Sequence, residues 1–339
     1  MLSSRGYRLA RGVSPLTIHW PLFMLAEWIE RVSEQFHEVV IGQQHLLRRL
    51  IQALIAGGHV LLEGVPGIGK TQSIVTLSKC LDASFRRLQF TPDLLPSDIT
   101  GTLIYEAASG RFTTRKGPIF ANIVLADEIN RAPGKAQSAL LEAMQEHQVT
   151  IGEESYALPE PFFVLATQNP LEHEATYPLP EAQLDRFLFH LTVSYPDAEH
   201  ERRIVDSMTR LQHLPQAHVV ATTGDILGSR AELENVHLDS KIRDYVVDLI
   251  GATREPKRYG IEVDGMVRAG ASTRAAIAMA LAAKAEALLE GRDYVVPHDV
   301  KSIAGDVLRH RILLTYDAAV QNVTSASLVD RILKSVPTP

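Results

Sequence analysis

The sequence predicts an α/β fold in which a five-stranded parallel sheet with helices on both faces is followed by a smaller all-helical domain. Five short apolar runs, typical of buried strands, alternate with helical or turn-rich sequence. A glycine-rich loop joins the first of these runs to a helix, and helical spacing alone continues after residue 196. Such a sheet gathers its ligand-binding groups at the carboxyl ends of its strands.

Length and composition fit a globular protein of two domains. The chain has 339 residues, of which 45% are hydrophobic and 22% are charged, and a typical single domain has about 150. A net charge of −6 gives no overall basic field that would attract nucleic acid. The single cysteine, Cys80, cannot form an internal disulfide, which indicates a reducing, cytoplasmic setting. The apolar stretch at 20–26 is too short for a signal peptide or membrane helix, so no membrane insertion is expected.

The change of pattern along the chain predicts three parts. We expect a flexible N-terminal extension over residues 1–18, an α/β core over 19–195 and a helical lid domain over 196–339. Helical spacing in the core is present at 22–36 and 44–56. The predicted strands cover 59–63, 85–90, 123–126, 162–167 and 188–193. Lid helices are expected at 198–212, 224–235, 239–252, 273–290, 298–309 and 324–335, with no strong strand among them.

Two alternating segments inside the core predict β-hairpins that project from the sheet. The first joins 101–105 to 110–114, and the second joins 148–151 to 155–158. Because neither is needed to complete a five-stranded sheet, each is either a device for contacting a partner or a surface decoration.

The stretch GVPGIGKT, from Gly64 to Thr71, predicts nucleotide binding. It matches GxxxxGK[ST] between an apolar strand and a helix-compatible segment at 72–81. Glycines let the backbone wrap a phosphate chain, and the helix N-terminus adds a partial positive charge. Lys70 is expected to reach the β- and γ-phosphates, and Thr71 to ligate Mg²⁺. The alternative is a chance match of a glycine loop. The predicted nucleotide-binding residues here are Gly64, Pro66, Gly67, Ile68, Gly69, Lys70, Thr71 and Gln72.

Polar side chains end two further predicted strands. Asp127 is expected to bind Mg²⁺, directly or through water, and Glu128 to polarise the water that attacks the γ-phosphate. Asn169 is expected to donate to the γ-phosphate or to hold that water. The alternatives are a helix N-cap for the acidic pair and a simple turn at Asn169 and Pro170.

In their order along the chain, these motifs resemble those of the MoxR family of AAA+ ATPases, a group of P-loop NTPases, over about residues 25–335. LPEAQLDRF at 179–187 and GASTRA at 270–275 add to the resemblance. It implies Walker A and B elements at 64–71 and 127–128, and sensor 1 at Asn169. The remaining implied roles are an arginine finger at Arg186 that completes the neighbouring subunit's site, sensor 2 at Arg274, and adenine packing by Val40, Ile41 and Gly42.

The same resemblance equates the two hairpins with the helix-2 insert and the pre-sensor-1 hairpin of a wider clade, which includes magnesium chelatases and replicative helicases. From the residues alone, Asp185 and Arg186 could equally form a local ion pair, and Arg274 could lie on a solvated helix face. Position 273, often proline in the family, is threonine here. Since Ser272 can still cap the helix, the sensor 2 geometry is expected to survive.

The resemblance implies a ring-shaped, hexameric and cytoplasmic ATPase that uses ATP and Mg²⁺ to remodel protein partners in a chaperone-like manner. The partner would often be a von Willebrand factor A-domain protein.

The alternative is a nucleic-acid motor of the helicase type, which Arg111, Arg115 and Lys116 favour. The negative net charge and the acidic hairpin tip at 153–154 disfavour nucleic acid as a partner. A third alternative, a small-molecule kinase, is disfavoured because it would not need a six-helix lid. The histidines show no metal-ligand spacing, so no metal other than Mg²⁺ is predicted.

Overall fold

Five parallel strands form the central sheet, as the sequence predicts. The computed structural model describes residues 22–339 except 66, 171–175, 210–214 and 264, so the predicted N-terminal extension lies outside the described residues. The strands pair in the order β10-β1-β9-β6-β3, and each pairing is parallel. Their carboxyl ends therefore lie along one edge of the sheet. The strands are β1 (Val60–Glu63), β3 (Phe85–Gln89), β6 (Ile123–Asp127), β9 (Phe163–Gln168) and β10 (Phe189–Thr192).

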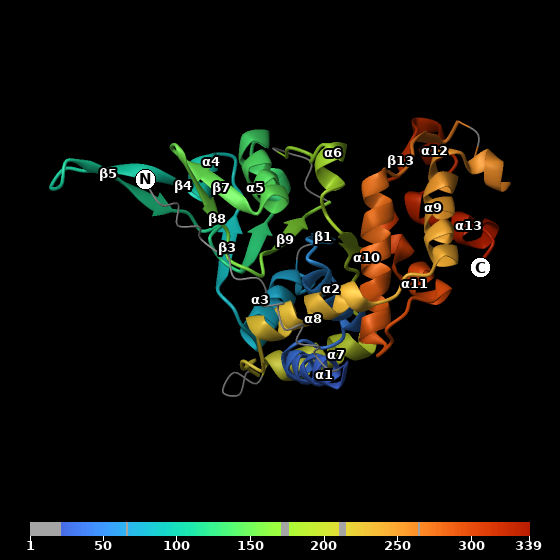
Figure 1. Ribbon diagram of the computed structural model, residues 1–339, viewed down its shortest axis with the longest axis horizontal. Coiled ribbons are helices and arrows are strands. Elements are labelled where there is room, and N and C mark those ends of the chain that lie inside the picture. The colour runs from blue at the N-terminus through green and yellow to red at the C-terminus, as the bar shows by residue number, and fades with distance from the viewer. Residues whose placement is uncertain (1–21, 66, 171–175, 210–214, 264) are drawn as a thin grey trace, which may run out of the picture.

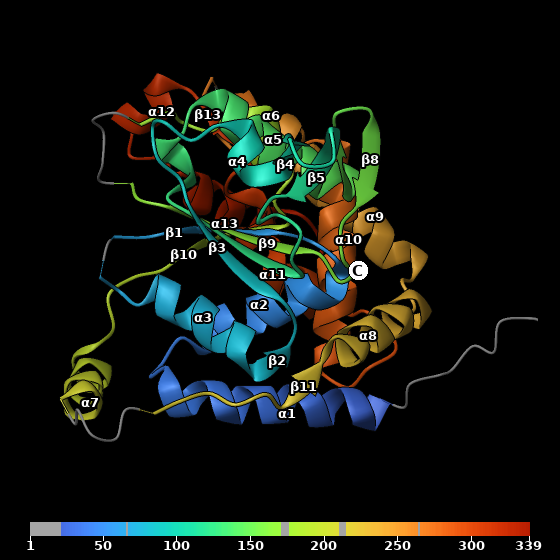
Figure 2. The same ribbon diagram turned by 90° about the vertical axis from the view of Figure 1, so that its left-hand side faces the viewer.

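Helices cover both faces of this sheet (Figure 2). Alternate residues of its central strands enter two separate cores. Leu125 and Leu165 pack with the first core, whereas Val124 and Val164 pack with the second. Strand residues alternate between faces, and burial of both faces explains the nearly continuous apolar runs in the sequence. The first core includes α1 (Leu22–Val39), α2 (Gln44–Ala56) and α3 (Lys70–Cys80), and the second includes α4 (Pro96–Thr100) and α5 (Gly134–Glu146).

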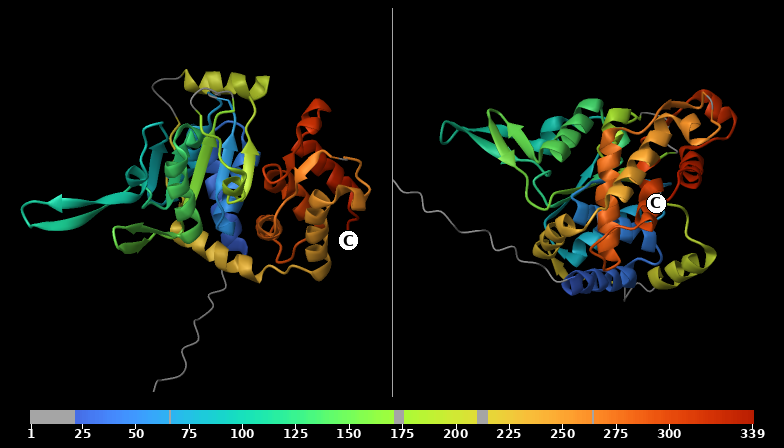
Figure 3. Two further views of the ribbon diagram at one scale, coloured as in Figure 1. Left: turned by 90° about the horizontal axis from the view of Figure 1, so that it is seen from above. Right: turned by 45° about the vertical axis from the view of Figure 1, so that its right-hand side comes forward.

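Two antiparallel hairpins project from the sheet domain at the predicted positions. They consist of β4 (Gly101–Glu106) with β5 (Arg111–Lys116), and of β7 (Gln148–Ile151) with β8 (Glu154–Ala157). The Thr114 and Tyr156 hydroxyl groups lie 2.9 Å apart and join the two hairpins. Figures 1 and 3 show the β4–β5 hairpin at the opposite end of the molecule from the C-terminal helices.

In the segment that follows the sheet, a short strand and a helix lie against the core, although the sequence assigns them to the lid. The segment contains α7 (Ala198–Met208), β11 (Ala221–Thr222) and α8 (Thr223–Asn235). Strand β11 pairs with β2 (Leu81–Asp82), and α8 packs on α1 and α2. The indole Nε1 of Trp28 donates to the hydroxyl of Ser229 at 3.0 Å in the interior. Helical spacing predicts α8 correctly, but it does not indicate whether the apolar side chains of α8 contact the core or the lid. The domain boundary at residue 195 stays a sequence prediction.

Five helices form the lid, together with a short antiparallel pair of strands. The helices are α9 (Ser240–Arg254), α10 (Thr273–Leu289), α11 (Pro297–Leu308), α12 (Tyr316–Val320) and α13 (Ser325–Ser335). The strands, β12 (Val267–Ala269) and β13 (Leu313–Leu314), have three and two residues and are too short to give a sequence pattern. In the described part of the chain, none of the helices combines the length and hydropathy needed to cross a bilayer.

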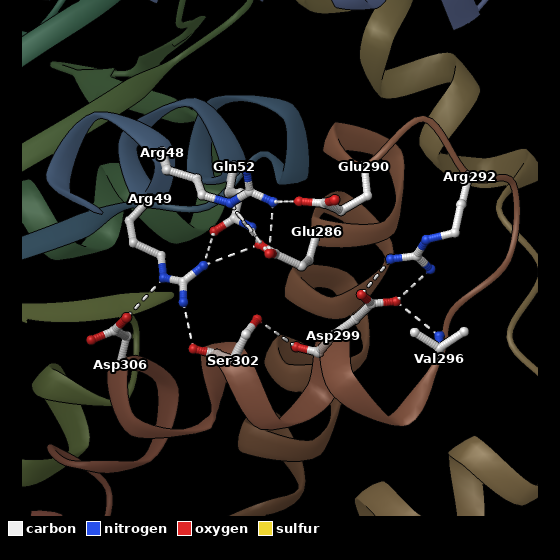
Figure 4. Close-up of polar contacts among 10 residues, drawn as sticks. All are labelled: Arg48, Arg49, Gln52, Glu286, Glu290, Arg292, Val296, Asp299, Ser302 and Asp306. Carbon is white, nitrogen blue, oxygen red and sulfur yellow. Dashed lines mark hydrogen bonds and ion pairs between the residues drawn. The ribbon is translucent and has the colours of Figure 1, made fainter. Parts of the chain in front are cut away.

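A buried ionic cluster holds the lid against α2 (Figure 4). Arg49 is 3% exposed, and its guanidinium donates to Glu286 of α10 at 3.1 Å and to Asp306 of α11 at 2.8 Å. Arg48 adds a second guanidinium at 2.7 Å from Glu286. Burial raises the pKa of Glu286, but the Arg48 hydrogen bond and the charges of both arginines outweigh that effect and lower it. This carboxylate therefore contributes stability above its unfolded-state pKa and loses it as the pH falls.

Glu286→Gln is expected to lower the free energy of unfolding by roughly 3–5 kcal/mol, because it leaves two guanidinium groups without their shared buried counter-ion. The matched control is Glu290→Gln on the same helix. Glu290 is half exposed, and among the described residues its carboxylate pairs with Arg48 alone, so its loss should cost about 1 kcal/mol or less. Chemical denaturation of both variants measures the difference, and equal losses would contradict a special role for the buried cluster.

Candidate active site

A loop between β1 and α3 leaves its backbone open to a ligand. Gly67 and Gly69 both have φ of +84°, which favours glycine, and a Cβ atom at either position would meet nothing within 4 Å. No side chain caps the N-terminus of α3, so its first N–H groups are available to an anion. Gly64 differs, because a Cβ there would lie 2.8 Å from the carbonyl oxygen of Val193. The predicted contact residue Pro66 lies outside the described residues.

This loop opens into a cavity of about 420 Å³ at the carboxyl edge of the sheet. Lys70 points back to the loop, and its Nζ donates to the Gly64 carbonyl oxygen and lies 3.4 Å from that of Gln168. The cavity thus combines the loop with residues from three strand ends. Its lining consists of Gly67, Gly69, Lys70, Thr71, Gln72, Arg87, Gln89, Asp127, Glu128, Thr167, Gln168 and Asn169.

Donors fix the orientation of Asp127, whose side chain is 10% exposed. The hydroxyl of Thr167 donates to its Oδ1 at 2.6 Å. The guanidinium of Arg87 donates to its Oδ2, from Nε at 3.1 Å and from Nη2 at 2.6 Å. Asp127 is therefore held by its neighbours on both β3 and β9.

Glu128 is held in the same cavity by different donors. Its Oε2 accepts from Gln89 at 2.9 Å and from Arg131 at 3.0 Å, while its backbone N–H donates to Thr167 at 2.9 Å. Glu128 has φ of 57°, an uncommon value for a residue with a side chain and one that often marks functional sites. It occupies the N-cap position of the short 3₁₀ helix Ile129–Arg131 but makes no side-chain capping bond. The helix-cap alternative therefore does not describe this carboxylate.

Asn169 lies at the end of β9, in the same cavity, and is 5% exposed. The side-chain amide of Asn130 lies 3.5 Å from its carbonyl oxygen. Because β9 sits between β1 and β6 in the sheet, Asn169 reaches the cavity between the phosphate loop and the two acids. The structure thus brings Lys70, Thr71, Asp127, Glu128 and Asn169 to one cavity, whereas Gly64 and Ile68 do not line it.

A second cavity, of about 300 Å³, contains Ile41 and Gly42. Leu46 and His200 also line it, as do residues 191–197 at the end of β10. The backbone N–H of Val193 donates to the carbonyl oxygen of Glu63 at 2.8 Å, so this cavity adjoins the start of the phosphate loop. Its apolar side chains suit a flat aromatic base.

Arg186 and Arg274 line neither cavity. Instead, they flank Asp185, which accepts from Arg311 at 2.7 Å and from Ser272 at 2.9 Å and lies 3.5 Å from Arg274. Arg186 makes no side-chain hydrogen bond or ion pair with the part of the chain that the structure describes. The alternative of a local pair between Asp185 and Arg186 is therefore wrong, because Asp185 instead joins the core to the lid.

Arg87 and Gln89 line the cavity but are not among the residues that the sequence predicts for the site. Both occupy β3, two residues apart, and contact the two acids from the neighbouring strand. A signal was available, because exposed polar side chains at i and i+2 of a strand lie on one face. Because both residues fall in the apolar run at 85–90, the sequence predicts them to be part of a buried strand. Their partners become apparent only from the pairing of β3 with β6.

The described residues fit a nucleoside triphosphate with a bound Mg²⁺ ion. Open glycine backbone, an uncapped helix N-terminus and Lys70 are suited to phosphate oxygens. The hydroxyl of Thr71 and the carboxylate of Asp127 line the same cavity, and Mg²⁺ prefers such oxygen ligands.

Comparisons with known proteins give a consistent result. Residues 59–189 match the family described as "ATPase family associated with various cellular activities (AAA)", and residues 262–332 match the AAA lid domain. The chain is 47% identical over 312 residues to Chaperone MoxR1 of Mycobacterium tuberculosis, covering 92% of this chain and 82% of that protein. It is 44% identical over 309 residues to the uncharacterized protein YeaC of Bacillus subtilis, covering 91% and 94%. A crystal structure of a protein assigned as an ATPase from Cytophaga hutchinsonii has a TM-score of 0.88 and 45% identity, covering 94% and 97%.

Proposed function

Because the chain belongs to the MoxR family of AAA+ ATPases, we propose that it couples Mg²⁺-dependent ATP hydrolysis to the remodelling of partner proteins in a hexameric ring. That it is an ATPase follows from the family. One observation carries the proposal: the phosphate loop, Asp127, Glu128 and Asn169 converge on one cavity. A chaperone-like role is supported by the similarity to Chaperone MoxR1.

In the proposed site, the loop from Gly64 to Gln72 wraps the phosphates, and Lys70 reaches the β- and γ-phosphates. Thr71 and Asp127 would hold Mg²⁺, which neutralises charge on the phosphate oxygens. Glu128 polarises the attacking water, and the Asn169 amide holds that water or donates to the γ-phosphate.

The base and the ribose would lie toward the second cavity, where Ile41 and Gly42 pack on adenine. Asp197 caps α7 at its entrance, accepting from the backbone N–H groups of Glu199 and His200. Val193, which lines this cavity, pairs with Glu63, the residue before the phosphate loop, so a single nucleotide would extend from the loop into the second cavity.

The ring is proposed because two family arginines lie away from the cavity of their own chain. Arg186 and Arg274 flank Asp185 on the core-to-lid junction and line neither cavity. We propose that Arg186 acts on the nucleotide of the neighbouring subunit, where its guanidinium stabilises the charge that develops on the γ-phosphate, and that Arg274 is sensor 2 of the lid. This arrangement requires a closed assembly in which each subunit completes the next site.

The partner is proposed to be a protein, and a von Willebrand factor A-domain protein in particular, in the cytoplasm. The test is a pull-down with the ATP-trapped Glu128→Gln variant, followed by mass spectrometry. Nucleotide-dependent recovery of an A-domain protein would support the proposal, and an ATP-dependent complex that contains only nucleic acid would count against it. The Lys70→Ala variant, in which ATP binding should be weakened, is the matched control.

Nucleic acid is not expected to stimulate ATP hydrolysis at moderate salt, and any binding should vanish as the salt concentration rises. The structure places Lys116, one of the three basic residues that favour a nucleic-acid motor, over the rings of Phe120 and Tyr156 at 4.8 and 5.0 Å. Its charge is thus already engaged with aromatic side chains. ATPase assays with single- and double-stranded nucleic acid test this expectation. Stimulation of several fold that is lost on replacing Arg111, Arg115 and Lys116 with alanine would favour the helicase-type alternative.

A further inference from the structure

Both acids of the site belong to one closed ring of hydrogen bonds that passes through Arg87. Arg87 donates to Asp127, Asp127 accepts from Thr167, and Thr167 accepts from the backbone N–H of Glu128. Gln89 closes the ring, since its amide donates to Glu128 at 2.9 Å and its carbonyl oxygen accepts from Arg87 at 3.3 Å.

Arg87 occupies acceptor positions that a metal ion would need. A carboxylate oxygen has about two lone-pair positions, and Asp127 Oδ2 accepts two donors from Arg87, at 3.1 and 2.6 Å. Oδ1 already accepts from Thr167 at 2.6 Å. With Arg87 in place, only one of the four acceptor positions remains for Mg²⁺ or for a water bound to it.

Charge leads to the same conclusion. The guanidinium of Arg87 lines the phosphate cavity and contacts the carboxylate that would face the metal. A divalent cation at this carboxylate would repel a guanidinium at hydrogen-bond distance from the same oxygen. The side chain of Arg87 is 52% exposed, so it can move from Asp127 into the cavity or the solvent without disturbing buried packing.

We propose that Arg87 is a positioning residue that competes with Mg²⁺ for Asp127, serving as the counter-ion of this carboxylate until the metal replaces it. This inference rests on the proposed metal role of Asp127. Arg87 keeps a nearly buried carboxylate paired before nucleotide and metal arrive. The same contact lowers the affinity of the site for the metal, because binding must first displace the guanidinium.

The test measures the affinity of the protein for Mn²⁺ in the presence of saturating ADP, with electron paramagnetic resonance as the readout of bound Mn²⁺. Arg87→Gln is expected to bind Mn²⁺ about 3- to 30-fold more tightly than the wild type. The variant lacks the charged, partly exposed guanidinium that competes with the metal for hydrogen-bond positions on Asp127. The matched control is Arg86→Gln, which removes the same charge from the adjacent exposed position on the other face of β3. Its Mn²⁺ affinity should stay within about twofold of the wild type.

Thermal unfolding separates competition from a purely structural role. In EDTA, Arg87→Gln should unfold at a lower temperature than the wild type, because Asp127 loses its counter-ion. With saturating Mg²⁺ and ADP this difference should disappear, since the metal then neutralises Asp127. The same difference under both conditions would overturn the proposal.

The Asp127→Asn variant distinguishes failure of this inference from failure of the proposed metal site. If Asp127→Asn binds Mn²⁺ as the wild type does, the proposed metal role of Asp127 is wrong, and the proposed competition between Arg87 and the metal is wrong as well. If Mn²⁺ binding depends on Asp127 but Arg87→Gln leaves the affinity unchanged or weakens it, the competition alone is wrong.

Discussion

Glu128→Gln is expected to slow ATP turnover by roughly two to four orders of magnitude while ATP affinity stays close to that of the wild type. Glutamine keeps the size of the side chain but removes the basic carboxylate that polarises water. The hydrogen bonds of Glu128 go to Gln89, Arg131 and Thr167 rather than to the phosphate loop. Nucleotide binding therefore need not change. Single-turnover hydrolysis and equilibrium binding of a fluorescent ATP analogue measure the two effects separately.

Two further variants serve as controls for Glu128→Gln. Glu142→Gln, at an exposed position of α5, should leave both turnover and affinity unchanged. Lys70→Ala should weaken ATP binding itself, because it removes a positive charge from the phosphates. If Glu128→Gln lost ATP affinity to the same degree as Lys70→Ala, Glu128 would belong to the binding machinery and not to the activation of water.

The central strands of the sheet could be predicted from the sequence because they are buried on both faces. Burial makes β1, β6 and β9 nearly continuous apolar runs, and each begins and ends within one residue of its predicted range. The placement of α8 could not be predicted in this way. Its burial against α1 and α2 depends on contacts such as Trp28 with Ser229, which lie far apart in the sequence. Spacing reports the period of a helix but not its neighbours.

The site shows the same division between local and non-local information. The phosphate loop is one contiguous segment, and its glycines have the left-handed backbone that the pattern implies. Asp127 and Asn169 each end a predicted strand, but their meeting in one cavity depends on β9 lying beside both β1 and β6. The contacts of Arg87 with Asp127, and of Arg311 with Asp185, join residues 40 and 126 positions apart. No local pattern records such pairs.

Arg186→Ala is expected to reduce ATP turnover by roughly 10³- to 10⁵-fold, the usual effect of losing an arginine finger, while ATP binding through Lys70 and Thr71 persists. The melting temperature should stay close to that of the wild type. Asp185 takes its hydrogen bonds from Arg311 and Ser272, so removing Arg186 leaves the contact between core and lid intact. Arg243→Ala, at an exposed position of α9, is the control for loss of a surface guanidinium and should retain activity.

Mixing two inactive variants tests whether Arg186 acts across a subunit boundary. Arg186→Ala subunits keep an intact phosphate site, and Lys70→Ala subunits keep an intact Arg186. Rings that contain both therefore include some interfaces with both parts, and they should recover measurable hydrolysis although each variant is nearly inactive alone. Native mass spectrometry establishes that mixed rings form. If mixed rings form without any recovery, Arg186 does not complete a neighbouring site, and the proposal that the ring depends on this residue fails.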